Sequence, residues 1–205
     1  MTHGDNKGAI LPPYVAPIQI VIVPIGKGQE LLTYSNKLFE ELNTHFRVHI
    51  DTSDHTPGWK FNYWEMNGVP LRIEIGKDEL NNNSLTLFYR HNLNRQTISC
   101  KDDIITLLKY NLKSIHDDLY TNAYNKLYSN IAYPQFEVDF DLALTNKKLC
   151  LLRWCGSDYC EQYIKNEYKA KSLCIPLDLP VSLNDANCLF CKNKATMTVL
   201  FGRSF

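Results

Sequence analysis

The sequence has no excess of either charge, because its 22 lysines and arginines balance 22 aspartates and glutamates. A net charge of zero argues against a protein that holds nucleic acid by bulk electrostatic attraction. It still leaves room for a local site that reads a base. The balance therefore limits how nucleic acid could be bound, without excluding that it is bound.

Long apolar runs are also missing. None approaches the roughly 18–20 residues that span a bilayer, and residues 1–8 contain no apolar segment of the signal-peptide kind. We therefore expect a cytoplasmic protein with no membrane partner. The chain does have seven cysteines. Without an export signal, this odd number favours metal binding over a disulfide framework.

Common catalytic motifs are absent as well. The six histidines form no H-E-x-x-H pair, and there is no G-x-S-x-G, no P-loop and no G-x-G-x-x-G after a strand. The glycines of Gly26–Gly28 indicate only a turn. These residues give no support to hydrolase, kinase or dehydrogenase chemistry.

The pattern of apolar residues predicts an α/β domain over residues 16–133, with a mixed sheet flanked by helices. A buried strand at Ile18–Val23, an amphipathic helix at Gln29–Asn43 and a strand at Arg47–Asp51 form a parallel βαβ unit. Further elements are expected in this order: a short helix within Thr56–Gly68, a strand at Leu71–Ile75, a hairpin of Leu85–Tyr89 and Gln96–Ser99, and a long helix that Ser99 caps and Pro134 ends.

The two ends of the chain differ from this domain in composition. Residues 1–15 are expected to be a linker, with a polar loop at 1–8 followed by an extended proline-rich connector. Residues 134–205 are cysteine-rich and predict a small α/β domain. Its expected elements are strands at Leu149–Trp154, Ser172–Pro176 and Val199–Phe201, and a helix at Gln162–Tyr168. A domain of about 70 residues usually needs a disulfide or a structural metal in addition to its apolar core.

Four cysteines have the spacing of a metal site. Cys155 and Cys160 form C-x4-C, and Cys188 and Cys191 form C-x2-C, 27 residues later. Two such pairs suit a tetrahedral zinc site of four thiolates, which leaves no open position and is therefore structural. Two alternatives remain open: four ordinary core cysteines, or a thiol redox pair at Cys188 and Cys191.

The other cysteines are Cys100, Cys150 and Cys174, which lie outside this pattern. Cys150 and Cys174 occupy apolar strand contexts. We expect both to be plain core residues.

A second candidate site lies in an aromatic segment. Residues 59–65 contain four aromatic side chains, and Arg72 follows the turn at Gly68. Unpaired RNA bases stack on aromatic rings and are read on their edges. Glu65 could accept from guanine N1–H and N2–H2, and an arginine can fork onto guanine O6 and N7. The alternative is an aromatic core with a simple Glu65–Arg72 ion pair.

Taken together, these segments resemble prolyl-tRNA synthetases, in the form found in eukaryotes and archaea. Residues 57–76 look like the anticodon-domain signature of that family. Further matching segments occur in family order at 3–8 with 16–19, at 171–176 and at 200–205. The resemblance spans essentially the whole chain and indicates an anticodon-binding domain followed by a zinc-binding domain.

The resemblance also implies roles for individual residues. Phe61 would stack a base, and Glu65 and Arg72 would read bases of the proline anticodon, whose second and third bases are guanines. Cys155, Cys160, Cys188 and Cys191 would bind structural zinc. The partner would be the anticodon loop of tRNA(Pro).

Two positions depart from the family pattern. Where the family has Gly-Pro, a basic residue and then Asp, this chain has Gly76–Glu79, so roles for Lys77 and Asp78 do not carry over. The family usually ends in tyrosine, whereas this chain ends in Phe205.

The class II catalytic domain, which uses ATP and Mg²⁺, would lie before Met1. We therefore expect a C-terminal portion that does not activate proline by itself. Full-length relatives would be homodimers, and this portion a monomer. The alternatives are a zinc-stabilised protein-interaction module and a stand-alone tRNA-binding accessory domain.

Overall fold

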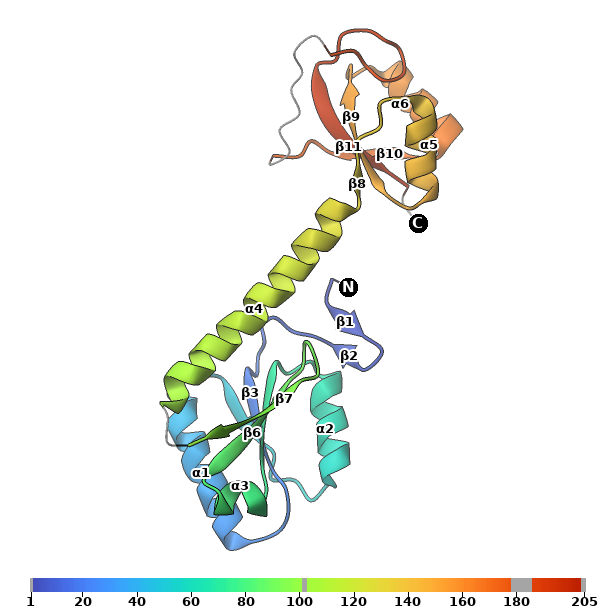
Figure 1. Ribbon diagram of the computed structural model, residues 1–205. Helices are drawn as coiled ribbons and strands as arrows, with labels where there is room; N and C mark the ends of the chain where they lie inside the picture. The colour runs from blue at the N-terminus through green and yellow to red at the C-terminus, as the bar shows by residue number, and fades with distance from the viewer. Residues whose placement is uncertain (1, 101–102, 178–185, 204–205) are drawn as a thin grey trace. The chain divides into compact units, whose positions relative to one another are not determined.

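The computed structural model describes residues 2–100, 103–177 and 186–203 (Figure 1). The chain divides into two compact units, Met1–Ala123 and Tyr124–Phe205. The boundary between them falls within the long helix α4, Ile104–Ser129. No helix in the described ranges is both long and apolar enough to cross a membrane.

The first unit is built on a five-stranded sheet of order β4-β3-β5-β6-β7. Its strands are β3 (Ile20–Pro24), β4 (Val48–Ile50), β5 (Leu71–Ile75), β6 (Ser84–Tyr89) and β7 (Arg95–Ser99). Strand β3 runs parallel to β4 and to β5, while β5–β6 and β6–β7 are antiparallel. The predicted α/β class with a mixed sheet is confirmed, including its parallel βαβ unit around α1 (Gln29–Asn43).

Strand alternation divides this sheet into two different faces. Ile20 and Ile22 pack with the apolar sides of α1 and α4, whereas Val21 and Val23 pack with Trp64 of α2 (Pro57–Met66). Helices α1 and α4 therefore cover one face and α2 covers the other (Figure 1). Each buried Leu or Ile contributes about 1.5–3 kcal/mol through its removal from water. The larger core, on the α1 and α4 face, is thus the main source of stability for this unit.

The second unit contains a four-stranded sheet of order β10-β11-β9-β8. Its strands are β8 (Ile131–Ala132), β9 (Leu149–Trp154), β10 (Lys171–Cys174) and β11 (Met197–Gly202), with helices α5 (Glu137–Thr145) and α6 (Asp158–Tyr168). Phe140, Ile164 and Phe201 lie at the centre of its core with no exposed surface. The small α/β fold predicted for this part of the chain is thus a mixed sheet with two helices.

Several sequence-based expectations differ from the structure. Instead of a polar loop, the first residues include a small hairpin of β1 (Gly4–Asp5) and β2 (Gly8–Ala9). Helix α5 was not expected, because its exposed Val138 and Leu142 obscure the buried stripe of Phe140, Ala143 and Leu144. Cys150 is buried as expected, but Cys174 is exposed, because β10 is an edge strand.

The start and end of α4 also differ from expectation. The proposed cap segment runs partly through residues 101–102, outside the described residues, and Ser99 belongs to β7. Instead, the Asp103 carboxylate accepts the Thr106 N–H at 3.1 Å, which satisfies a free donor of the first turn. The helix ends at Ser129, before Pro134, because the chain enters strand β8. The terminal Phe205 lies outside the described residues.

Candidate nucleic-acid and metal sites

Helix α2 is held on the sheet by a polar network beneath it. Trp64 Nε1 donates to Asp51 Oδ2 at 2.8 Å, and the buried Lys60 Nζ donates to the Asp51 carbonyl at 2.9 Å. Burial alone would raise the pKa of Asp51, but hydrogen bonds from Ser53 and Trp64 lower it overall. The carboxylate therefore stays charged opposite Lys60 and fixes the position of the helix.

The turn after α2 brings the helix next to β5. Gly68 has a φ of +74°, and a Cβ there would lie 2.8 Å from the Ala9 carbonyl oxygen of the β1–β2 hairpin. Only glycine suits both this left-handed conformation and this close contact. The turn thus places Phe61 and Glu65 of α2 opposite the polar side chains of β5.

Arg72 of β5 is the centre of the resulting cluster. Its side chain is 2% exposed. Its Nη1 donates to Glu65 Oε1 at 3.1 Å and to the Phe61 carbonyl at 3.3 Å, and its Nη2 donates to Glu74 Oε1 at 2.8 Å. The structure therefore brings Phe61, Glu65 and Arg72 together, and it also contains the ion pair that was the alternative interpretation.

Two aromatic rings enclose the Arg72 guanidinium. Its central carbon lies 4.0 Å from the centre of the Phe61 ring and 4.1 Å from that of Phe88 on β6. These are cation–π distances, and such contacts are strongest when the cation is desolvated. The arrangement orients the Phe61 ring and leaves Arg72 little freedom to move.

Arg95 is an accessible cation of this site, and sequence reasoning missed it. Its side chain is 55% exposed, its Nη2 lies 3.3 Å from Glu74 Oε1, and its guanidinium lies 5.8 Å from the Phe61 ring centre. Arg95 pairs with Phe88 across the β6–β7 hairpin, so both side chains point to the α2 face. The hairpin register was the signal that could have found it.

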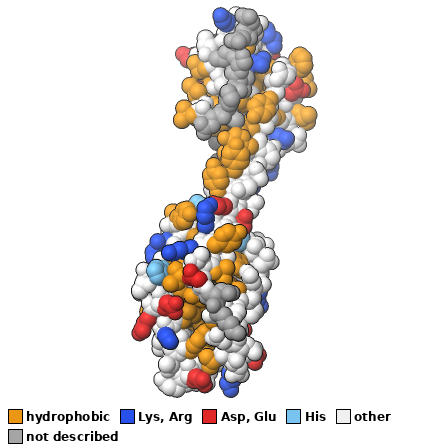
Figure 2. Space-filling model, turned by 60° about the vertical axis from the view of Figure 1, so that its left-hand side comes forward, with side chains coloured by type: hydrophobic (Ala, Val, Ile, Leu, Met, Phe, Trp, Pro, Cys, Tyr) orange, Lys and Arg blue, Asp and Glu red, His pale blue; other side chains and the backbone are white. Residues whose placement is uncertain are grey.

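Charge around the first unit is mixed. Figure 2 shows lysines and arginines beside acidic side chains on the visible face. The cation of the site is therefore a local feature, in agreement with the zero net charge.

An exposed aromatic stack occupies another side of α2. The rings of His55 and Trp59 are 3.8 Å apart, those of Trp59 and Tyr63 are 5.1 Å apart, and Trp59 is 45% exposed. The four aromatic residues of this segment therefore point to different sides of α2. Trp64 lies in the core and Phe61 lies in the arginine cluster. Trp59 and Tyr63 face solvent.

The four cysteines of the predicted metal site meet in the second unit. Cys155 follows β9, Cys160 lies in the first turn of α6, and Cys188 and Cys191 lie in the loop before β11. All four sulfur atoms lie within 4.8 Å of one another, and the Cys155 and Cys191 sulfurs are 3.6 Å apart. Zinc–sulfur bonds of about 2.3 Å at tetrahedral angles place sulfurs about 3.8 Å apart, so this donor set fits the ion.

Backbone geometry directs these thiols toward one point. The Ser157 hydroxyl caps α6 by accepting the Tyr159 N–H, and the Cys188 N–H donates to the Asn193 carbonyl at 2.7 Å.

Burial raises the pKa of the Cys155 and Cys160 thiols. Burial also acts to raise that of Cys191, but the Asn193 N–H and the neighbouring thiols lower it to about 7.

Comparison with known proteins matches both units. The family model described as "Anticodon binding domain" matches residues 19–110, and "Prolyl-tRNA synthetase, C-terminal" matches residues 138–205. The proline–tRNA ligase of Phytoplasma australiense is 39% identical over 206 aligned residues, which cover all of this chain and 42% of the ligase. Those of Mycoplasmopsis pulmonis and Bacillus cereus (proline–tRNA ligase 2) are 37% and 33% identical, with all of this chain and 43% of each ligase covered.

The chain belongs to the prolyl-tRNA synthetase family.

The two family matches contain the two candidate sites. Residues 19–110 include Phe61, Glu65, Arg72 and Arg95, and residues 138–205 include all four cysteines of the cluster. The chain spans less than half the length of each of these three ligases.

The Gly76–Glu79 segment forms a capped turn. These residues begin the short helix α3, Lys77–Asn81. The Glu79 carboxylate accepts the Gly76 N–H at 2.9 Å and the Thr86 hydroxyl at 3.0 Å. Glu79 therefore closes the first turn of the helix and ties it to β6.

Proposed function

We propose that this chain binds the anticodon loop of tRNA(Pro) and selects the cognate tRNA for a prolyl-tRNA synthetase. The single observation that carries the proposal is the cluster of Phe61, Glu65 and Arg72, with the accessible Arg95 beside it. It combines an aromatic ring, a carboxylate and a cation, which are the groups that hold and read an unpaired guanine.

Glu65 keeps enough hydrogen-bonding capacity to read a base. One oxygen accepts from Arg72, and the other lies 3.4 Å from Lys7 Nζ, a long contact to a half-exposed side chain. A carboxylate has about four acceptor positions. Glu65 can therefore accept from guanine N1–H and N2–H2 while its ion pair with Arg72 holds it in place.

Arg72 and Arg95 have different roles in this proposal: one positions the site and the other contacts the RNA. To contact a base directly, as the sequence predicted, Arg72 would have to leave Glu74 or the Phe61 carbonyl. We assign Arg72 to positioning Phe61 and Glu65. Arg95 is exposed and keeps most of its donors, so it supplies the fork onto guanine O6 and N7 or a phosphate contact.

The cysteine cluster is proposed to bind structural zinc. Four thiolates leave no position for substrate or water, so the ion would clamp the chain between α6 and β11. In isolated zinc modules such binding contributes on the order of 10 kcal/mol to folding. Cys160 and Cys188 are buried within the unit, which suits a structural role.

The family matches support a proposal for the whole protein. We propose that a full-length synthetase with these regions joins proline to tRNA(Pro), with ATP and Mg²⁺ bound in a separate catalytic domain. The domains proposed for this chain are a linker at 1–15, the anticodon-binding domain at 16–133 and the zinc domain at 134–205. This portion would act as a monomer in the cytoplasm, and the complete enzyme as a homodimer.

The test is a titration of the zinc-loaded chain with a labelled proline anticodon stem-loop at a stated salt concentration, because salt screens phosphate contacts. A matched stem-loop has its two guanines replaced. We expect the guanine loop to bind at least about tenfold tighter, as for one or two base-edge contacts. Equal binding of the two loops would overturn the proposal. It would favour the interaction module, for which the exposed Trp59–Tyr63 stack is the natural contact surface.

A further inference from the structure

The sheet of the second unit has α5 and α6 on the same face. Phe140 of α5 and Ile164 of α6 share a core with Leu152 of β9. Leu151 belongs to a separate apolar cluster. Because side chains alternate along a strand, Leu151 and Arg153 of β9 point away from the two helices. We call the side to which they point the second face of this sheet.

A pocket of about 310 Å³ lies on the second face. Leu151 and Arg153 line it from β9, residues 133–135 line it from the segment after β8, and the loop before β11 contributes Asn187 and Lys192. Its volume is near the lower end of the range of about 300–1,000 Å³ for ligand sites. A group of the size of a phosphate can therefore enter it.

Two accessible cations line this pocket. Arg153 is exposed, and its guanidinium forms no hydrogen bond or ion pair with another residue that the structure describes. Lys192 is also exposed, and its Nζ donates to the Leu189 carbonyl at 2.5 Å. An arginine has five N–H donors and a lysine has three. The pocket thus presents positively charged donors that a ligand can reach.

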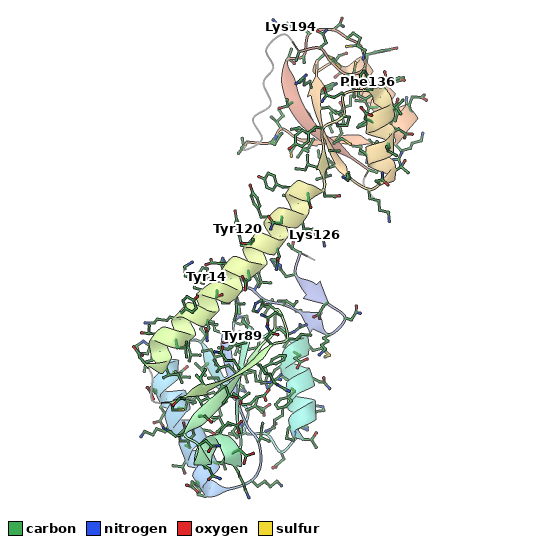
Figure 3. All side chains as sticks on the ribbon, viewed as in Figure 1. Tyr14, Tyr89, Tyr120, Lys126, Phe136 and Lys194 are labelled. Atoms are coloured by element: carbon green, nitrogen blue, oxygen red, sulfur yellow. The ribbon has the colours of Figure 1, made fainter. Side chains whose placement is uncertain are left out.

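Charge is distributed unevenly between the two sides of this sheet. Every acidic residue that the structure describes in this unit lies on α5 or α6, and the described lining of the pocket contains no carboxylate. Lys171 of β10 lies on the second face, because its neighbour Ser172 points the other way and donates to Glu161 of α6. Lys194, labelled in Figure 3, is a further exposed cation of the loop before β11. The second face therefore attracts anions.

These features suit a phosphate that belongs to a polyanion. The planar fork of an arginine binds two phosphate oxygens at once. Further cations on the same face, at Lys171 and Lys194, match an extended chain of phosphates better than a single small ion. Contacts with backbone phosphates carry no sequence information. The function proposed above already supplies such a polyanion, which is RNA.

We propose that this pocket binds a backbone phosphate of RNA, with the Arg153 guanidinium on its oxygens and Lys192 as the second cation. The proposal rests on the RNA-binding function proposed above, and it gives the second unit a contact with RNA that is independent of base sequence. The loop that carries Lys192 also carries Cys188 and Cys191. The cysteine cluster thus fixes one wall of the pocket.

The test titrates the zinc-loaded chain at several salt concentrations with two transcripts, tRNA(Pro) and the same tRNA with its two anticodon guanines replaced. Arg153→Gln should weaken binding of both by the same factor of about three to ten, between the values for an exposed ion pair and a charge-assisted hydrogen bond. It should also make the slope of log affinity against log salt shallower by about 0.7–0.9, the share of one phosphate.

Lys165→Gln is the matched control. It removes the same charge from an exposed residue of α6 that does not line the pocket, so it should bind both transcripts like wild type. Wild-type affinity and slope in Arg153→Gln, or an equal loss in Lys165→Gln, would overturn the pocket proposal.

A measurement on the wild-type chain removes any dependence on the folding of the variants. The Nε–H resonance of Arg153 should shift when oligouridine is added, because this RNA has a phosphate backbone but no guanine. It should stay in place with oligoglutamate at the same ionic strength. A shift with oligoglutamate and none with oligouridine would assign the pocket to an acidic protein and overturn the RNA proposal.

The guanine preference of the wild-type chain reports separately on the anticodon site. If that preference is present and Arg153→Gln changes nothing, the pocket proposal fails and anticodon binding stands. If the preference is absent while Arg153→Gln still weakens binding of both transcripts, anticodon reading fails and the phosphate contact stands.

Discussion

The Arg72 guanidinium lies 4.0 Å from the centre of the Phe61 ring and donates a hydrogen bond to the Phe61 carbonyl. One side chain thus orients both the ring and the backbone of α2. A base that stacks on Phe61 would meet a ring that is already in place. The conformational entropy of the Phe61 side chain is then lost during folding, and RNA binding does not have to supply that free energy.

The first prediction separates the two arginines of the site. Arg72→Ala removes the buried partner of Glu65 and Glu74 and leaves them only the exposed Lys7 and Arg95, so the free energy of unfolding should fall by about 3–5 kcal/mol. Arg95→Ala should change it by less than about 1 kcal/mol, because Arg95 is exposed. Urea unfolding measures both values.

RNA titration of the same pair completes the comparison. Arg95→Ala should weaken binding of the guanine stem-loop by about tenfold with the fold intact. If Arg95→Ala binds like wild type, the accessible cation of the site has been assigned wrongly.

The second prediction concerns the metal. Cys188→Ser should abolish the binding of one zinc ion per chain, whereas Cys174→Ser, at an exposed cysteine outside the cluster, should keep it. Thermal unfolding of the second unit should shift downward in the Cys188 variant and after chelation, by about 4–8 °C for each kcal/mol lost.

Metal analysis of the purified chains, together with the melting curves, checks this. Wild-type protein that contains no zinc and melts unchanged in chelator would show that the four cysteines are ordinary core residues.

The third prediction follows from the ion pair that joins the β1–β2 hairpin to Arg90, the residue directly after β6. A hydrogen bond from the fully buried Arg90 lowers the pKa of Asp5 from 3.8 to about 2. The unfolded chain therefore takes up this proton at a higher pH than the folded chain. The contribution of the pair is present above about pH 4 and is lost as the pH falls toward 2.

Asp5→Asn should accordingly make the decline in stability between pH 4 and 2 shallower. The urea midpoint at several pH values measures this, with Asp54→Asn at an exposed loop residue as the matched control. Equal slopes for Asp5→Asn and wild type would contradict the assignment.

The fourth prediction tests the turn that places α2 against β5. Gly68→Ala puts a methyl group 2.8 Å from the Ala9 carbonyl and strains a positive φ, so it should destabilise by more than about 1 kcal/mol. Gly58→Ala has no atom within 4 Å of the new Cβ and lies in the first turn of α2, so it should be neutral or stabilising by up to about 1 kcal/mol.

RNA affinity of the Gly68 variant should fall as well, because the turn sets the position of Glu65 relative to Arg72. Wild-type stability and affinity in Gly68→Ala would show that the turn tolerates a side chain and does not position the site.

The sequence alone determined most of the elements. Ile18–Val23, Gln29–Asn43 and Leu71–Ile75 were predictable because the strands are short apolar runs and the helix has regular apolar spacing. The cysteine pairs were predictable from their spacing, because a loop of any moderate length can close onto a metal ion. The family matches agree with the resemblance found in the sequence.

Only the tertiary structure decided how the side chains of the site divide their roles. Arg72 is enclosed because β6 places Phe88 beside it, and Arg95 is accessible because it lies on the edge strand β7. Burial of a polar side chain depends on neighbours that are distant in sequence, so local patterns show which residues are present but not which of them water or a base can reach.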